Sequence, residues 1–250
     1  MNILILLVDY ILRRLDALLE PYDVGLFRNI SPIMKSSKTV ISGSFVVNLL
    51  TTCPPSPILP FTPGDIDFYV PRSGEQILLD FLIASQYLLT STRPYYHYDH
   101  ADHRGIHHMH TLSKNNKQVH VVVVLSSNNP IHAIVNFDST LPMNFISDTA
   151  IVCLYPDTTL SYIGIKTPHQ ISHPKFWSKY IDRGYSFVNQ SSHANHSCLN
   201  KVRSVLDGHS LIWILDSKMP DSSLQQFDLK WILPGICCNS TPRTMFSYDI

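Results

Sequence analysis

The sequence contains few charged residues. Of its 250 residues only 15% are Asp, Glu, Lys or Arg, and the 19 basic side chains balance the 19 acidic ones. Globular domains usually contain about 25% charged residues. A chain with no formal net charge excludes a strongly basic nucleic-acid coat protein and an acidic tail protein.

Cysteine is scarce as well and occurs in an uninformative pattern. The chain has five cysteines, an odd number, and no two of them form a C-x-x-C pair. This argues against a disulfide framework and against a zinc site made of cysteines. A reducing intracellular compartment, cytoplasmic or nuclear, is therefore the expected location.

Long apolar runs are also missing. No stretch reaches the ~18 apolar residues that a membrane span needs, so we expect no membrane partner. The apolar residues near the start instead recur at helical spacing and predict an amphipathic helix over residues 3–20 that packs on the core. With 44% hydrophobic residues, the chain can bury a sizeable core.

The periodicity along the chain predicts helices interspersed with strands. We expect strands over residues 38–42, 65–70 and 150–155, a hairpin of 106–112 with 118–125, and helices over 45–50, 77–84, 130–135 and 175–185. A proline-rich loop occupies residues 54–63. This order predicts an α/β (α+β) fold with a mixed sheet flanked by helices over residues 1–170, followed by a small helical or irregular extension over 171–250.

The most informative unit joins a glycine turn to two acidic residues. Gly43 and Ser44 follow the first strand and open a helix, where free N–H groups favour an anion such as phosphate. Asp65 and Asp67 are two residues apart on the next strand, so both side chains point to one face. Two carboxylates this close repel each other, and a divalent cation, Mg²⁺ or Mn²⁺, would relieve the repulsion.

This arrangement resembles the nucleotidyltransferase superfamily with the polymerase-beta-like fold, whose mark is a Gly-Ser turn followed by D-x-D on the next strand. The matching residues are Gly43, Ser44, Asp65 and Asp67. The stretches at 137–146 and 155–156 are similar to a fungal group of proteins built on that fold. The resemblance covers roughly residues 36–165, and residues 171–250 show no specific resemblance.

The resemblance implies transfer of a nucleoside monophosphate from a nucleoside triphosphate to an acceptor, which could be RNA, a protein or a small molecule. Ser44 would help to bind the triphosphate, and Asp65 and Asp67 would be catalytic and hold the metals. The family has a third carboxylate on a later strand, where this chain has His120. The third metal ligand is therefore His120 or, from a neighbouring strand, Asp138.

Two other functions stay open. Without the third carboxylate, the chain would be a catalytically degraded module that binds a nucleotide or a protein. Alternatively, a histidine-rich stretch makes it a metal-binding protein, since imidazoles bind transition metals well. That stretch contains His97, His100, His103, His107, His108 and His110. Farther along, Arg203 and Asp207 have helical spacing and are expected to form a surface pair.

Overall fold

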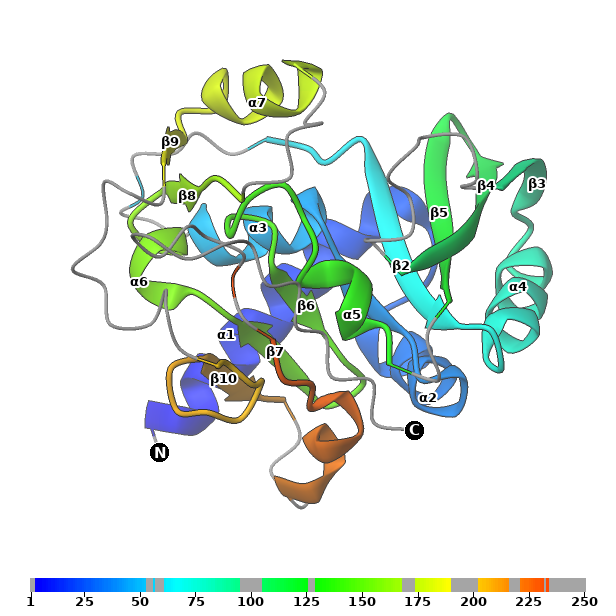
Figure 1. The fold of residues 1–250 in the computed structure, drawn as a ribbon. Helices are drawn as coiled ribbons and strands as arrows, with labels where there is room; N and C mark the ends of the chain where they lie inside the picture. The colour runs from blue at the N-terminus through cyan, green and yellow to red at the C-terminus, as the bar shows by residue number, and fades with distance from the viewer. Residues whose placement is uncertain are drawn as a thin grey trace.

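The computed structural model describes residues 3–52, 56, 61–94, 105–125, 129–167, 174–189, 202–215, 221–231 and 233. At its centre is a mixed sheet of eight strands in the order β10-β7-β6-β1-β2-β5-β4-β3, flanked by helices (Figure 1). The α+β class with a mixed sheet is thereby confirmed.

The strands of the main sheet run antiparallel to their neighbours, except for β2 and β5, which are parallel. They are β1 (Val40–Ser42), β2 (Asp65–Pro71), β3 (Leu88–Pro94), β4 (Ile106–Lys114), β5 (Lys117–Val124), β6 (Asn144–Ile146), β7 (Ala150–Cys153) and β10 (Leu211–Ile214). The predicted hairpin of residues 106–112 and 118–125 is confirmed as β4 and β5. Its turn residues Asn115 and Asn116 have φ values of 49° and 61°, as a two-residue turn of type I′ requires.

Helices cover both faces of the sheet. They are α1 (Ile3–Leu19), η1 (Glu20–Tyr22), α2 (Phe27–Ser37), α3 (Ser44–Thr51), α4 (Glu75–Ala84), α5 (Ile131–Ile134), α6 (Pro156–Thr159), α7 (Pro174–Ile181) and η4 (Asp221–Phe227). Successive residues of β5 belong to two different hydrophobic cores. Val121 and Val123 pack with residues of α1 to α4, whereas Val122 and Val124 pack with residues of α5 and η4. The apolar run of β5 is therefore buried on both faces.

The second half of the chain adds strands as well as helices. After α7, β9 (Ser186–Val188) pairs in parallel with β8 (Ile163–Ile165), and β10 extends the main sheet beside β7. The division into a domain over 1–170 and an extension over 171–250 stays a prediction. Residues 53–55 and 57–60 of the proline-rich stretch lie outside the described residues. Among the helices of the described part, none is long and apolar enough to cross a membrane.

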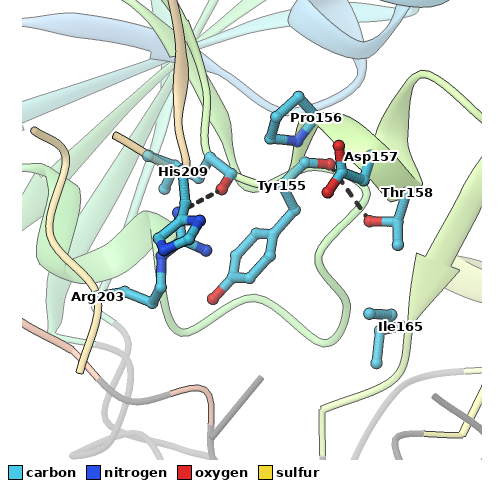
Figure 2. A pocket seen from close by; sticks show the side chains of 8 residues that line it. Tyr155, Pro156, Asp157, Thr158, Ile165, Arg203 and His209 are labelled. Carbon is cyan, nitrogen blue, oxygen red and sulfur yellow. Dashed lines mark hydrogen bonds between the residues drawn. The ribbon is translucent and has the colours of Figure 1, made fainter. Parts of the chain in front are cut away.

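The prediction that Arg203 and Asp207 form a surface pair on a helix is wrong. No helix includes these residues, and only 1% of Arg203 is exposed. The guanidinium group of Arg203 lies 4.8 Å from the ring centre of Tyr155 (Figure 2). It donates hydrogen bonds to Asp207 and, at 2.8 Å, to the Leu154 carbonyl. Arg203 is therefore buried and Asp207 is half-buried, and Arg203 connects a late segment of the chain to the loop that leads into α6.

Candidate metal centre

The turn between β1 and α3 lies directly against an acidic side chain of β2. Gly43 has a φ of 76° and a ψ of −151°, a combination that is open almost only to glycine. A Cβ atom on Gly43 would lie 2.5 Å from Oδ2 of Asp67. The missing side chain at Gly43 thus lets the Asp67 carboxylate contact the turn that opens α3.

Asp65, Asp67 and His120 form a group that we name the Asp–His centre. Because β2 and β5 are parallel neighbours with Asp67 opposite His120, the sheet register brings the imidazole to the acids. Nδ1 of His120 lies 2.9 Å from Oδ1 of Asp67 and 3.8 Å from Oδ2 of Asp65. One ligand atom from each residue lies within 4.8 Å of the other two, a spacing that could hold a metal ion. The side chains are 28%, 23% and 17% exposed for Asp65, Asp67 and His120, so the centre is open to solvent.

Burial and mutual charge set the protonation of this centre. Burial, followed by the negative charge of Asp67, raises the pKa of Asp65 above its usual value. Burial alone would lower the pKa of His120, but the hydrogen bond that His120 donates to Asp67 and the negative charges of both acids outweigh burial and raise this pKa. Two adjacent carboxylates thus attract positive charge, whether a proton or a cation.

Ser44 fits an anion beside the acids. It is the first residue of α3 and is 3% exposed, and its Oγ has no hydrogen-bond partner among the described residues. Buried hydroxyl groups are nearly always hydrogen-bonded. The first N–H groups of a helix also lack a carbonyl partner within the helix, and an oxyanion satisfies such donors.

Lys179, in the last turn of α7, and Arg183, two residues after its end, supply positive charge near Asp65. Lys179 and Arg183 both act to lower the pKa of Asp65, against the effect of burial. The segment is anchored because the Tyr185 hydroxyl lies 2.5 Å from Oγ1 of Thr51 in α3 and because Arg183 stacks 3.9 Å from the ring centre of Phe61. Figure 1 shows α7 on the side of the molecule where β2 begins. The sequence predicted this helix but gave no signal that connects it to the acids.

Asp138 does not belong to the centre. It lies between α5 and β6, is 7% exposed, and accepts a hydrogen bond on its backbone carbonyl from the N–H of Thr167 at 2.9 Å. Its carboxylate is not among the described ligand atoms that gather around Asp65 and Asp67. Of the two third ligands that the sequence left open, the structure brings only His120 to the acids.

Two carboxylate oxygens and one imidazole nitrogen suit certain divalent cations better than others. Mg²⁺ prefers oxygen ligands, whereas Mn²⁺ and Zn²⁺ accept imidazole as well. The donor set therefore fits a divalent cation, which Asp65, Asp67 and His120 would hold beside the N-terminus of α3. A cation there could neutralise the charge of an anion bound at the helix end.

The fold and this centre define an α+β protein whose mixed sheet presents a group able to hold a metal. No protein-family model matches the chain, and no curated protein sequence matches it either. A solved structure described as "tRNA-processing enzyme (apo form I)" is similar, with a TM-score of 0.42 and 12% sequence identity. The match covers 65% of this chain and 42% of that one, so this chain spans less than half of that enzyme's length. A likeness this low carries no argument about activity.

Proposed function

We propose that this chain binds a nucleoside triphosphate together with a divalent cation at the Asp–His centre. The observation that carries the proposal is the contact between the glycine turn and the acids. Gly43 is so close to Asp67 that a Cβ would be 2.5 Å from the carboxylate. A helix end that accepts phosphate and a pair of carboxylates that attracts a cation therefore adjoin each other.

Each group has a distinct part in such binding. Phosphate oxygens would accept hydrogen bonds from the first N–H groups of α3 and from the Ser44 hydroxyl, which has no partner in the described part of the chain. Lys179 and Arg183 would add positive charge toward the phosphates. The bound cation would neutralise charge on the triphosphate. Asp65 and Asp67 orient that cation relative to the helix end, which favours in-line attack on a phosphorus atom.

The reaction that the Gly-Ser and D-x-D resemblance implies is transfer of a nucleoside monophosphate to an acceptor hydroxyl. The balance is simple: the acceptor oxygen bonds to the α-phosphorus, the bond to the bridging oxygen breaks, and pyrophosphate leaves. The acceptor classes to be tested are RNA ends, protein hydroxyls and small hydroxylated molecules. Transfer would need a group that removes the acceptor's proton, and Asp65 and Asp67 are the carboxylates in place.

One observation favours a second candidate, binding without transfer. The third ligand position holds His120, whose Nδ1 is already 2.9 Å from Oδ1 of Asp67. An imidazole does not add the negative charge that a third carboxylate would add beside the metals. A module that binds the triphosphate without transferring it is therefore consistent with the same geometry.

Calorimetric titration with the four nucleoside triphosphates tests the binding. We expect binding in Mg²⁺ or Mn²⁺ that is lost in chelator, with Mn²⁺ at least as effective because of His120. The variant Asp67→Asn should lose the metal-dependent part, whereas Asp80→Asn, an exposed acid on α4, should bind like the wild type. Equal binding by both variants would refute the assignment.

A labelled α-phosphate separates the two candidates. Incubation with each acceptor class should move the label onto the acceptor and release pyrophosphate if transfer occurs. Tight, metal-dependent binding without label transfer to any class would favour the binding module.

A further inference from the structure

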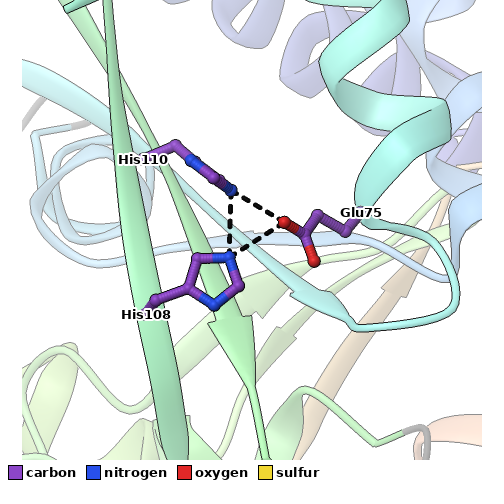
Figure 3. Close-up of side chains that lie close together, drawn as sticks. All are labelled: Glu75, His108 and His110. Carbon is purple, nitrogen blue, oxygen red and sulfur yellow. Dashed lines mark hydrogen bonds and ion pairs between the residues drawn. The ribbon is translucent and has the colours of Figure 1, made fainter. Parts of the chain in front are cut away.

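A second group of ligand atoms converges between α4 and β4, which we name the His–Glu centre. Oε1 of Glu75 lies 2.9 Å from Nε2 of His108 and 2.8 Å from Nε2 of His110. The two Nε2 atoms are 3.0 Å apart, so the three atoms form a nearly equilateral triangle (Figure 3). The side chains are 20%, 14% and 9% exposed for Glu75, His108 and His110.

The backbone fixes all three side chains. His108 and His110 are two residues apart on β4, so both point to the face that α4 covers. Glu75 is the first residue of α4, where the helix dipole favours a carboxylate. The preceding Gly74 contacts α2 so closely that a Cβ there would be 1.9 Å from the Ser37 carbonyl oxygen. That contact holds the start of α4, and with it Glu75, over the strand.

While Glu75 is ionised, no placement of protons on the two imidazoles makes all three contacts of this triangle favourable. If both Nε2 atoms carry a proton, each donates to Oε1, but the two N–H groups then face each other. If one Nε2 is deprotonated, it can accept from the other imidazole, but its lone pair faces the carboxylate oxygen. A divalent cation removes the conflict, because all three atoms then direct a lone pair at the cation.

The groups behind the imidazoles orient them for this role. Nδ1 of His110 lies 2.8 Å from Oγ1 of Thr92 on β3, and Nδ1 of His108 lies 2.5 Å from Nδ1 of His107. Metal-binding histidines usually hydrogen-bond through the ring nitrogen that does not face the metal. Such a bond at Nδ1 leaves the lone pair of Nε2 directed into the triangle.

We propose that Glu75, His108 and His110 bind a zinc ion that ties α4 to β4, separately from the triphosphate and its cation. Two imidazoles and one carboxylate are a known zinc ligand set that leaves a fourth position for water. Tetrahedral bonds of 2.0–2.1 Å separate ligand atoms by about 3.3 Å. The observed separations need to grow by only a few tenths of an ångström to reach that value.

Cobalt and zinc titrations of the full chain, purified without a histidine tag, test this proposal. Co²⁺ should give the visible absorption of a tetrahedral site, and Zn²⁺ should abolish it at about one equivalent. His110→Ala and Glu75→Gln should each lose this absorption, whereas His209→Ala, an exposed histidine, and Glu20→Gln, an exposed glutamate, should keep it. Absorption that persists in both ligand variants, or no zinc binding by the wild type, would overturn the proposal.

Two further measurements keep the result unambiguous. The titrations are repeated with the Asp67→Asn variant, so that metal bound at the Asp–His centre is not counted. If Asp67→Asn loses the cobalt absorption while His110→Ala and Glu75→Gln keep it, the proposal is overturned. Circular dichroism checks the folding of each variant. If His110→Ala fails to fold, His110→Gln retains a hydrogen-bonding side chain of similar reach, and retention of the cobalt spectrum by that folded variant would count against the site.

Discussion

The substitution Gly43→Ala tests the geometry on which the proposed function depends. Alanine would meet two separate penalties. Its backbone would have to adopt the φ of 76° and ψ of −151° of Gly43, and its Cβ would lie 2.5 Å from Oδ2 of Asp67. Relief of that contact requires the carboxylate to move, and Asp67 also contacts Nδ1 of His120 at 2.9 Å.

The expected loss of stability follows from these two penalties, backbone strain and the contact of the Cβ with Asp67. Backbone strain of this kind costs about 1–3 kcal/mol. Weakening the contact between Asp67 and His120 adds about 1 kcal/mol, so the free energy of unfolding should fall by about 2–4 kcal/mol. For a chain of this size the melting temperature should drop by about 5–15 °C. Metal-dependent triphosphate binding should be lost together with the stability.

Substitutions at two other glycines distinguish the cost of backbone strain from the cost of the clash. Gly208 has a φ of +77° but no atom within 4 Å of an added Cβ, so Gly208→Ala measures backbone strain without a clash. Gly64 has no such neighbour either and no positive φ, so Gly64→Ala should change stability little. Urea unfolding followed by circular dichroism compares the three variants. If Gly43→Ala is as stable as Gly64→Ala and still binds metal and triphosphate, the reasoning about the glycine turn is refuted.

Three further predictions concern other parts of the chain. Burial raises the pKa of Asp207, but hydrogen bonds, first the one from Arg203, outweigh burial and lower this pKa below its usual value. The ionised pair therefore stabilises the fold above about pH 4, and this stabilisation is lost as the pH falls through the lowered pKa. Asp207→Asn should thus lower the free energy of unfolding at pH 7 by about 3 kcal/mol and flatten its acid dependence in urea titrations; an unchanged pH profile would contradict this. Lys179→Gln should weaken triphosphate binding by about three- to fivefold in calorimetry while the exposed Lys35→Gln does not, and equal effects would count against a role for α7. Burial raises the pKa of Cys153 to about 12, so its thiol should resist alkylation in the native protein and react only in denaturant, as peptide mapping would show.

The local elements of the Asp–His centre could be predicted from the sequence, because they depend on short-range rules. Alternation along a strand places Asp65 and Asp67 on one face, and a glycine before an apolar helix indicates a turn. The position of His120 opposite Asp67 depends on the parallel pairing of β2 with β5, which α4, β3 and β4 separate in the sequence. No local pattern encodes that pairing, although the resemblance indicated the same strand position.

Contacts between distant segments account for what the sequence did not predict. Lys179 lies near Asp65 only because Tyr185 and Thr51 anchor the segment around α7 to α3. Arg203 and Asp207 have the spacing of an exposed helical pair, yet aromatic rings and a carbonyl elsewhere in the chain accept the buried guanidinium group. The histidine-rich stretch suggested a metal site but not Glu75, because that acid comes from α4, far from the histidines in the sequence. Of the same stretch, His97, His100 and His103 lie outside the described residues.

The register of β5 with its neighbours makes the two centres independent. On one side Asp67 pairs with His120, and on the other side Thr111 pairs with His120 and His110 with Val121. Because adjacent rungs of a sheet point to opposite faces, His120 lies on one face and His110 on the other. The packing agrees, since Val121 belongs to the core formed with α1 to α4, and Val122 belongs to the other core. A substitution at Asp67 therefore leaves the ligands of the His–Glu centre in place, and zinc binding there can be measured while the Asp–His centre is disabled.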